Sequence, residues 1–262
     1  MIWIAVGLVV LMPSGVCWYL ARRADLRVRL LRTTGPSTVA ELVESRRESW
    51  AEGRRVFRQR CGVTGVVRSH EDGTLTSEHG RIECVWHKHK VTETFLKVRA
   101  DAELHGWNPI EAGMTTVALQ TTDAAFLLED DTGRLVIRPA GHAVEGAEKA
   151  VDRYVAVPPA EGLTSVQEVL RYGERTHGHR EEEWVVRAGT RLFVHGEVSA
   201  EAEEPLVISA PADGGPFVMS ARSRDQLLRE EDGRRRAFRA LAGVFTATGA
   251  VLLAVGAVTA FY

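Results

Sequence analysis

The segment EWVVRAGTRLFVHGEVSA, residues 183–200, carries the clearest secondary-structure signal in the chain. Its two apolar runs, Trp184–Val186 and Leu192–Val198, are rich in valine and aromatic residues, which pack well on a pleated sheet. A short polar connection that contains Gly189 separates the runs. We therefore predict two short strands here, and the same pattern recurs along the chain.

Similar apolar or alternating runs lie on both sides of this segment, with turn residues such as Asp131-Thr132-Gly133 between them. They are Val56–Val67, Cys84–Val98, Thr115–Thr121, Ala124–Leu128, Leu135–Arg138, Leu206–Ala210 and Phe217–Met219. The helical patterns between them are short and cover residues 39–52, 166–172 and 224–230. Many short strands with few helices favour a mainly β (α+β) fold. We predict one OB-like barrel or sandwich domain over residues 37–230.

Both ends of the chain are apolar. Residues 2–21 and 240–262 contain no charged side chain, and each segment is long enough to cross a bilayer of about 30 Å as a helix. Basic residues follow the first segment, whereas a cleaved signal peptide would carry them in front, so we predict two retained transmembrane helices. The second carries a stripe of small residues that suits packing against the first helix or a second copy of the chain, namely Ala242, Thr246, Ala250 and Ala254.

Arginines cluster on the inner flanks of both segments, at positions 22, 23, 27, 29 and 32 and at positions 229, 234, 235, 236 and 239. The positive-inside rule then places the central domain in the cytoplasm. Cys61 and Cys84 do not form a disulfide framework, which agrees with a reducing compartment. Lysine occurs only at positions 88, 90, 97 and 149, a bias that we take as a sign of a GC-rich bacterial genome. We therefore expect an integral protein of a bacterial cell membrane.

Composition and motifs exclude several function classes. The balance of 33 basic against 35 acidic side chains argues against a nucleic-acid-binding protein, which needs a basic face. The chain contains no Walker loop, dinucleotide fingerprint, nucleophile elbow or CxxC pair. Asp131-Thr132-Gly133 matches the aspartic-protease tripeptide, but its charged neighbours favour an exposed hairpin, and a second copy is missing. The residues therefore indicate no catalytic site and no cofactor.

Two pairs of histidines offer nitrogen atoms that could bind a metal ion. His87 and His89 lie two residues apart in a predicted strand, so they point to the same face. No third ligand lies at a characteristic spacing, so packing within the barrel is favoured over metal binding. His177 and His179 precede three glutamates in a stretch that reads as a solvated loop. No metal site is predicted.

The face opposite His87 is the candidate surface for binding a partner. Trp86, Lys88 and Lys90 share that face of the predicted strand and combine an aromatic ring with two cationic side chains. The alternative interpretation is an amphipathic strand with an ordinary solvated face.

Three ordered segments resemble the GIDE domain family, also called BAM, which includes the membrane-anchored RING ubiquitin ligases of mitochondria. They are residues 75–89 with Cys84-Val85-Trp86, the hairpin of residues 126–137, and residues 183–198 with Val194-His195-Gly196-Glu197-Val198. The similarity continues through residues 217–228 into the second apolar segment. The resemblance implies a strand-rich domain between two spans that binds substrates or partners.

The eukaryotic members carry a RING finger after the second span, and a RING needs eight Cys or His ligands for two zinc ions. No cysteine follows Cys84, so we expect no RING in this chain. We therefore predict a membrane-anchored, non-catalytic module that binds a protein partner or ligand. Two alternatives stay open: an E3 ubiquitin ligase-like component whose catalytic module is supplied in trans, and an oligomeric membrane scaffold.

Overall fold

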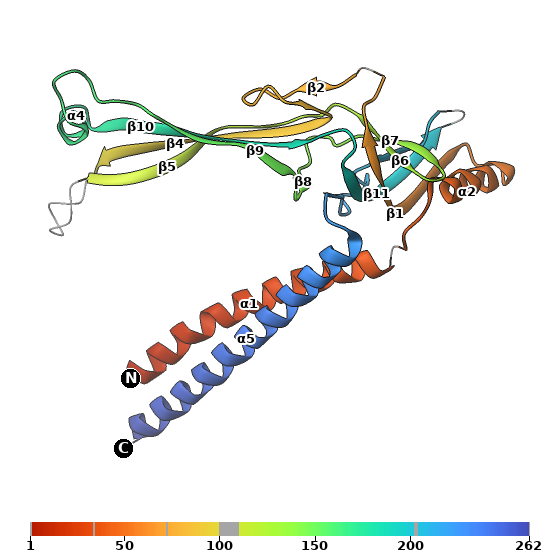
Figure 1. Ribbon diagram of the computed structural model, residues 1–262. Coiled ribbons are helices and arrows are strands. Elements are labelled where there is room, and N and C mark those ends of the chain that lie inside the picture. Colours follow the sequence, from red (N-terminus) through yellow and green to blue (C-terminus); the bar gives the residue numbers. More distant parts are fainter. Residues whose placement is uncertain (1, 34, 72, 100–109, 202–203, 262) are drawn as a thin grey trace. The chain divides into compact units, whose positions relative to one another are not determined.

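The computed structural model describes residues 2–33, 35–71, 73–99, 110–201 and 204–261 (Figure 1). The chain divides into two units, which are described separately. One consists of residues 1–36 and 222–262 and contains the terminal helices α1 (Ile2–Thr33) and α5 (Arg224–Phe261). The other, residues 37–221, contains all the strands.

Helices α1 and α5 form an antiparallel pair, with both termini at the same end in Figure 1. Small residues let their backbones approach closely. An ideal Cβ added to Gly249 would lie 2.7 Å from Cδ2 of Leu11, so a larger residue does not fit there without movement. Ser14 adds a polar contact, because its Oγ lies 2.7 Å from Oγ1 of Thr246 and donates a hydrogen bond to the carbonyl of Ala242. These features match close helix packing within a membrane.

The two helices continue beyond their apolar segments into charged ends that pair with one another. Salt bridges join Arg27 to Glu231 at 3.2 Å, Arg32 to Asp232 at 2.7 Å and Arg235 to Asp25 at 3.0 Å. Several of the arginines that predicted the orientation therefore also hold the helix pair together.

Helix α5 contains a segment long and apolar enough to cross a membrane, whereas α1 does not meet the same criterion over its described residues. Described side chains begin at Val6, and Tyr262 also lies outside the described residues. In the predicted stripe of small residues, Ala242 is buried and Thr246 bonds to α1, but Ala250 and Ala254 are exposed. Pairing with the first helix is thus confirmed only for the first half of the stripe.

The centre of the second unit is a five-stranded barrel. Its strands are β1 (Val56–Arg68), β6 (Phe126–Asp130), β7 (Gly133–Ile137), β11 (Arg191–Glu201) and β12 (Val207–Ser209). They pair in the order β1-β6-β7-β12-β11, and β11 closes the ring by pairing with β1 from Val56↔Glu201 to Val66↔Arg191. All pairs are antiparallel except β7 with β12.

The barrel interior is filled by alternate side chains of these strands. Val63, Val67, Leu128, Ile137 and Leu192 are all fully buried and belong to one apolar cluster. Strand β6 joins β1 next to Gly65, and an ideal Cβ on Gly65 would lie 2.6 Å from the carbonyl oxygen of Glu129. Only glycine allows that close approach.

A second sheet of four antiparallel strands, here called the arm sheet, has the order β5-β4-β10-β9 (Figure 1). The strands are β4 (Trp86–Val98), β5 (Ile110–Thr121), β9 (Glu148–Ala156) and β10 (Glu174–Val186). Strands β4 and β5 are inserted between the barrel strands β1 and β6, whereas β9 and β10 are inserted between β7 and β11. Two separate insertions therefore build one sheet.

The remaining elements are short. Strands β2 (Leu75–Thr76) and β3 (Glu83–Cys84) form a small hairpin, and β8 (Val144–Glu145) and β13 (Val218–Ser220) extend the barrel sheet from β11. Helix α4 (Ser165–Tyr172) lies between β9 and β10.

Helix α2 (Val39–Ala51) is capped by the β6–β7 hairpin as well as by its own capping box. The amide of Val39 donates to Oδ2 of Asp130 at 2.8 Å, and that of Ala40 donates to Oγ1 of Thr132 at 3.0 Å. The amide of Glu41 donates to Oγ1 of Thr38. The first free amides of the helix are thus all satisfied.

The structure confirms a barrel with further sheets and few helices between two long terminal helices, in a mixed α and β architecture. The predicted strands lie within or close to β1, β4, β5, β6, β7, β10, β11, β12 and β13, although Thr115–Thr121 and Trp184–Val186 cover only the last parts of β5 and β10. Strand β9 was not predicted. The prediction of a solvated loop around His177 and His179 was wrong, because these residues lie within β10, a central strand of the arm sheet.

Candidate functional site

The three residues predicted to bind a partner lie on one face of β4 but at different depths. Trp86 is fully buried in the apolar cluster that fills the barrel, so it is not available at the surface. Lys88 and Lys90 lie further along β4, where the strand continues into the arm sheet, and both are partly exposed. A partner-binding role for the two lysines stays a prediction, without Trp86 as their aromatic neighbour.

Trp184 of β10 is the aromatic ring that accompanies the lysines. It lies directly opposite Lys88 and next to Lys149 in the register of the sheet. Nζ of Lys88 and of Lys149 lie 5.7 Å and 5.4 Å from the Trp184 ring, so both make cation–π contacts with it.

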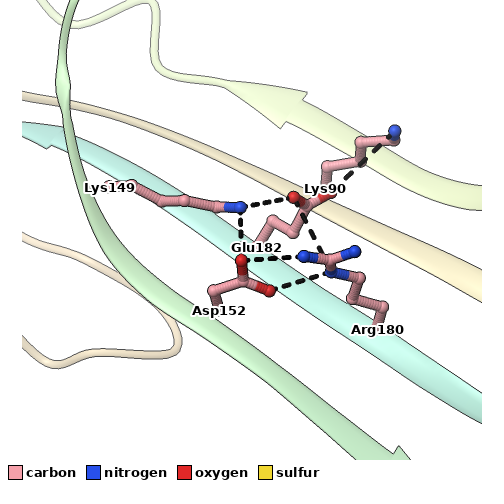
Figure 2. Close-up of polar contacts among 5 residues, drawn as sticks. All are labelled: Lys90, Lys149, Asp152, Arg180 and Glu182. Atoms are coloured by element: carbon pink, nitrogen blue, oxygen red, sulfur yellow. Dashed lines mark hydrogen bonds and ion pairs between the residues drawn. The ribbon is translucent and has the colours of Figure 1, made fainter.

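Five charged side chains on the same face form a network across three strands (Figure 2). Nζ of Lys149 lies 2.6 Å from Asp152 and 2.7 Å from Glu182, and Arg180 binds both carboxylate oxygens of Asp152 at 2.8 Å and 2.9 Å. Lys90 lies at the edge of the network, with its Nζ 4.0 Å from Glu182. Three cations face two carboxylates, which leaves a local excess of positive charge.

The network stabilises the charged forms of its members. Hydrogen bonds from Arg180 and then Lys149 lower the pKa of Asp152 well below its usual range, and bonds to Asp152 and Glu182 raise the pKa of Lys149. Asp152, Lys149 and Arg180 are thus held in their charged forms, which suits electrostatic recognition and not proton transfer.

The opposite face of the arm sheet is partly covered by the β2–β3 hairpin, which is held by a buried carboxylate. Glu183 is fully buried and accepts hydrogen bonds from Oγ of Ser77 at 2.9 Å and from the amides of His79 and Gly80 at 3.1 Å and 2.7 Å. Burial alone would raise the pKa of Glu183, but these bonds outweigh it and lower the pKa. The hairpin is therefore fixed to β10 by a carboxylate.

This arrangement brings two histidines together. The rings of His79 and His89 are perpendicular with centroids 5.2 Å apart, and Nδ1 of His89 lies 3.2 Å from Oε2 of Glu78. His87, the partner expected for His89, instead has its Nδ1 3.9 Å from Sγ of Cys84. Of the histidines considered from the sequence, only His89 joins this cluster.

Other candidates from the sequence have structural roles. Burial raises the pKa of Cys61 to about 12 and that of Cys84 to about 11, so both are protonated thiols at neutral pH. All three cysteines are buried and unpaired. In the tripeptide considered as a protease motif, Asp131 is exposed, and the neighbouring Asp130 caps helix α2.

Comparison with known proteins decides the family. The sequence profile of the GIDE family, described as E3 ubiquitin ligase, matches residues 107–255, more than half of the chain. The chain belongs to the GIDE family. A curated relative, mitochondrial ubiquitin ligase activator of nfkb 1-A of Danio rerio, is 30% identical over 92 residues. This match covers 35% of this GIDE protein but only 27% of the relative, and no solved structure matches.

The sequence alone does not identify Trp184, Glu78 and His79 as members of these two clusters. Trp184 lies in a predicted strand, but its pairing with Lys88 depends on a register that the sequence does not specify. Glu78 and His79 are ten or more positions before His89 and reach it only because the hairpin folds back over the sheet.

Proposed function

We propose that this GIDE protein is a membrane-anchored module that binds a partner protein through its arm sheet and performs no chemistry of its own. The observation that carries this proposal is strand β5, the outermost strand of the sheet. Within the described residues β5 pairs only with β4, so its outer edge offers free backbone groups. Such an edge is a template for a strand from another chain.

The side chains of β5 support this role. Met114, Val117 and Leu119 are 76%, 51% and 60% exposed, and no charged residue lies between Glu111 and Asp123. Edge strands that avoid association usually carry a proline, or a lysine or another charged residue. Lys88 and Lys90 lie on the neighbouring strand β4, directly opposite Thr121 and Leu119 of β5. An acidic partner segment would therefore find cations beside the edge.

The barrel supports a binding function as well. Numbered along the chain, its five strands follow the order first, second, third, fifth and fourth around the ring. We assign the barrel to the OB-like class, whose members bind ligands on loops and sheet faces.

The carboxylates support the absence of acid catalysis in this proposal. The pKa shifts of Asp130, Asp152 and Glu183 all favour the ionised carboxylate, whereas a general acid at neutral pH needs a raised pKa.

For the location, we propose that α1 and α5 both span a bacterial cell membrane and that the arginine-flanked domain faces the cytoplasm. The close packing of α1 against α5 and the arginines at positions 22–32 and 229–239 support this arrangement.

The experiment is capture of partners from native membranes by chemical cross-linking, with the full-length protein and a Met114→Lys Val117→Lys variant. Two lysines on β5 should prevent strand addition, so a partner captured by the wild type should be lost. The matched control is Val166→Lys Leu170→Lys on α4, where two similarly exposed apolar residues gain the same charge. A partner retained equally by both variants would contradict the proposal.

A second candidate function is suggested by the family description, E3 ubiquitin ligase. In that case this chain would hold the substrate while another protein supplies the catalytic module. Purified protein should then leave the discharge of a ubiquitin-charged conjugating enzyme unchanged until a RING protein is added. Acceleration by this chain alone would overturn the non-catalytic proposal.

The scaffold alternative rests on the exposed half of the small-residue stripe. An Ala250→Leu variant with unchanged self-association in detergent would exclude it.

A further inference from the structure

We propose that the β2–β3 hairpin and strand β4 form a binding site for a divalent transition-metal ion such as Zn²⁺, with Glu78, His79 and His89 as ligands. This inference is independent of the partner-binding function. One potential ligand atom from each of the three residues lies within 4.8 Å of the other two. Two imidazole nitrogens and one carboxylate oxygen are a ligand set that zinc commonly takes.

The first argument is that the two imidazoles present unsatisfied nitrogens inside the cluster. His89 is only 5% exposed, and among the described residues its Nδ1 has no hydrogen-bond partner, although Oε2 of Glu78 lies 3.2 Å away. Nε2 of His79 is also buried, again without a hydrogen-bond partner in the part of the chain that the structure describes. Burying a polar nitrogen without a partner is unfavourable, and a bound metal ion would remove that cost at both residues.

The second argument is the orientation of His79. If Nε2 binds the metal, Nδ1 is left to face the carboxylate of Glu181, whose Oε2 lies 3.8 Å away. A metal-binding histidine typically uses its other ring nitrogen to contact a carboxylate, which fixes the ring and makes it a stronger ligand. Glu181 is itself held by an ion pair with Arg153, so the orienting carboxylate has a defined position.

The third argument is that the ligands sit on a fixed frame. The backbone amides of His79 and Gly80 donate to Glu183, and His89 lies directly opposite Glu183 in the sheet. Around a tetrahedral ion with bonds of about 2.0–2.2 Å, ligand atoms lie roughly 3.3–3.5 Å apart. Oε2 of Glu78 already lies at this spacing from Nδ1 of His89, at 3.2 Å, and the widest separation in the cluster, at most 4.8 Å, exceeds it by about 1 Å.

Three protein ligands leave a fourth position for water. Bound metal would join the hairpin to β4 in addition to the carboxylate of Glu183. We therefore expect it to stabilise the hairpin on this face of the arm sheet.

The test is titration of the full-length protein in detergent, stripped with a chelator, with Zn²⁺ by calorimetry and with Co²⁺ by visible absorption. We expect a single equivalent to bind, with a cobalt spectrum that lacks a thiolate band. His79→Gln and Glu78→Gln should each weaken binding at least about 10-fold, and Glu181→Gln should weaken it by about 10-fold. His79→Gln keeps the backbone amide that donates to Glu183, so the hairpin should remain folded.

The matched control is His177→Gln, because His177 is an exposed histidine of β10 outside the cluster and should not alter the affinity. Absence of binding to the wild type would overturn the proposal, as would equal binding by all variants. Loss in His79→Gln with full affinity in Glu78→Gln would overturn the three-ligand assignment.

Discussion

Replacing Asp130 with Asn should loosen helix α2 from the barrel, although the two side chains have the same shape. In the native protein Oδ1 of Asp130 accepts from the amide and hydroxyl of Thr132, both at 2.7 Å, and from the amide of Gly133 at 2.9 Å. Oδ2 accepts from the amide of Val39 at 2.8 Å. The amide oxygen of Asn can replace Oδ1, but its NH₂ group then faces the N–H of Val39.

The expected cost has two parts. The unpaired N–H of Val39 costs about 1–3 kcal/mol, and loss of a negative charge at the helix N-terminus costs about 0.3–1 kcal/mol. We therefore expect Asp130→Asn to lower the free energy of unfolding by about 1.3–4 kcal/mol. For a unit of this size that corresponds to a fall in melting temperature of roughly 3–16 °C.

The assay is thermal unfolding of the full-length protein in detergent, followed by near-ultraviolet circular dichroism, together with hydrogen exchange of peptides from α2. Asp131→Asn is the matched control, since Asp131 is the exposed neighbour. If Asp130→Asn melts within 1 °C of Asp131→Asn, the capping argument is wrong.

The pH dependence gives an independent check. Burial alone would raise the pKa of Asp130, but the hydrogen bonds from Thr132, Val39 and Gly133 outweigh it and lower the pKa. A carboxyl group with a lowered folded-state pKa stabilises the protein fully above its unfolded pKa of about 3.9. That contribution is lost as the pH falls through the folded pKa, so the wild type and Asp130→Asn should converge in strong acid.

Three further substitutions test other parts of the molecule. Gly249→Leu should separate α1 from α5, because even a Cβ there would lie 2.7 Å from Leu11. Cysteine cross-linking between the two helices should then fall several-fold. Gly243→Leu is the control, because a Cβ on Gly243 meets open space. Arg175→Gln should release α4, since the buried side chain of Arg175 binds Glu168, Ser165 and the carbonyl of Val157. We expect the free energy of unfolding to fall by about 2–4 kcal/mol and the proteolysis of residues 157–173 to become faster. Burial and then Arg60 lower the pKa of His195, so the wild type should lose stability as the pH falls below about 6.5. His195→Leu removes this buried titrating group and should be neutral or stabilising by about 1–2 kcal/mol at pH 5. An unchanged pH profile of unfolding would contradict this.

The barrel could be predicted from the sequence because its strands contain short runs of apolar residues. On β11 residues 192–196 are all buried, and Leu192, Val194 and Val198 belong to the core, so the apolar run is visible without knowing the partner strands. The capping box formed by Thr38 and Glu41 is an equally local feature, and it marks the start of α2. Local signals of this kind predict elements but not which strands become neighbours.

The arm sheet could not be predicted in the same way. Strand β10 carries Arg180, Glu181, Glu182 and Glu183 in succession, a pattern that normally indicates a solvated segment. It forms a strand because each charge has a partner on one face or the other, and those partners lie on β4, β9 and the β2–β3 hairpin.

The candidate site shows where periodicity stops being informative. Alternation correctly places Trp86, Lys88 and Lys90 on one face of β4. It does not tell how deep each residue lies, and β4 begins inside the barrel core, where Trp86 is enclosed. Depth depends on the point at which a strand leaves the core, which is a property of the tertiary structure.

The origin of the arm sheet in two insertions has a consequence for folding. When β4 and β5 emerge from the ribosome, their central partner β10 has not been made, and an isolated two-stranded ribbon is only marginally stable in water. Strand β10 leads directly into β11, and β12, which joins β11 to β7, follows soon after, so sheet assembly and barrel closure depend on the same stretch of nascent chain. Such long-range pairing is slow, and β5 would stay exposed to misassociation during the delay. Cells that make this protein should therefore rely on chaperone protection until residue 209 has been synthesised.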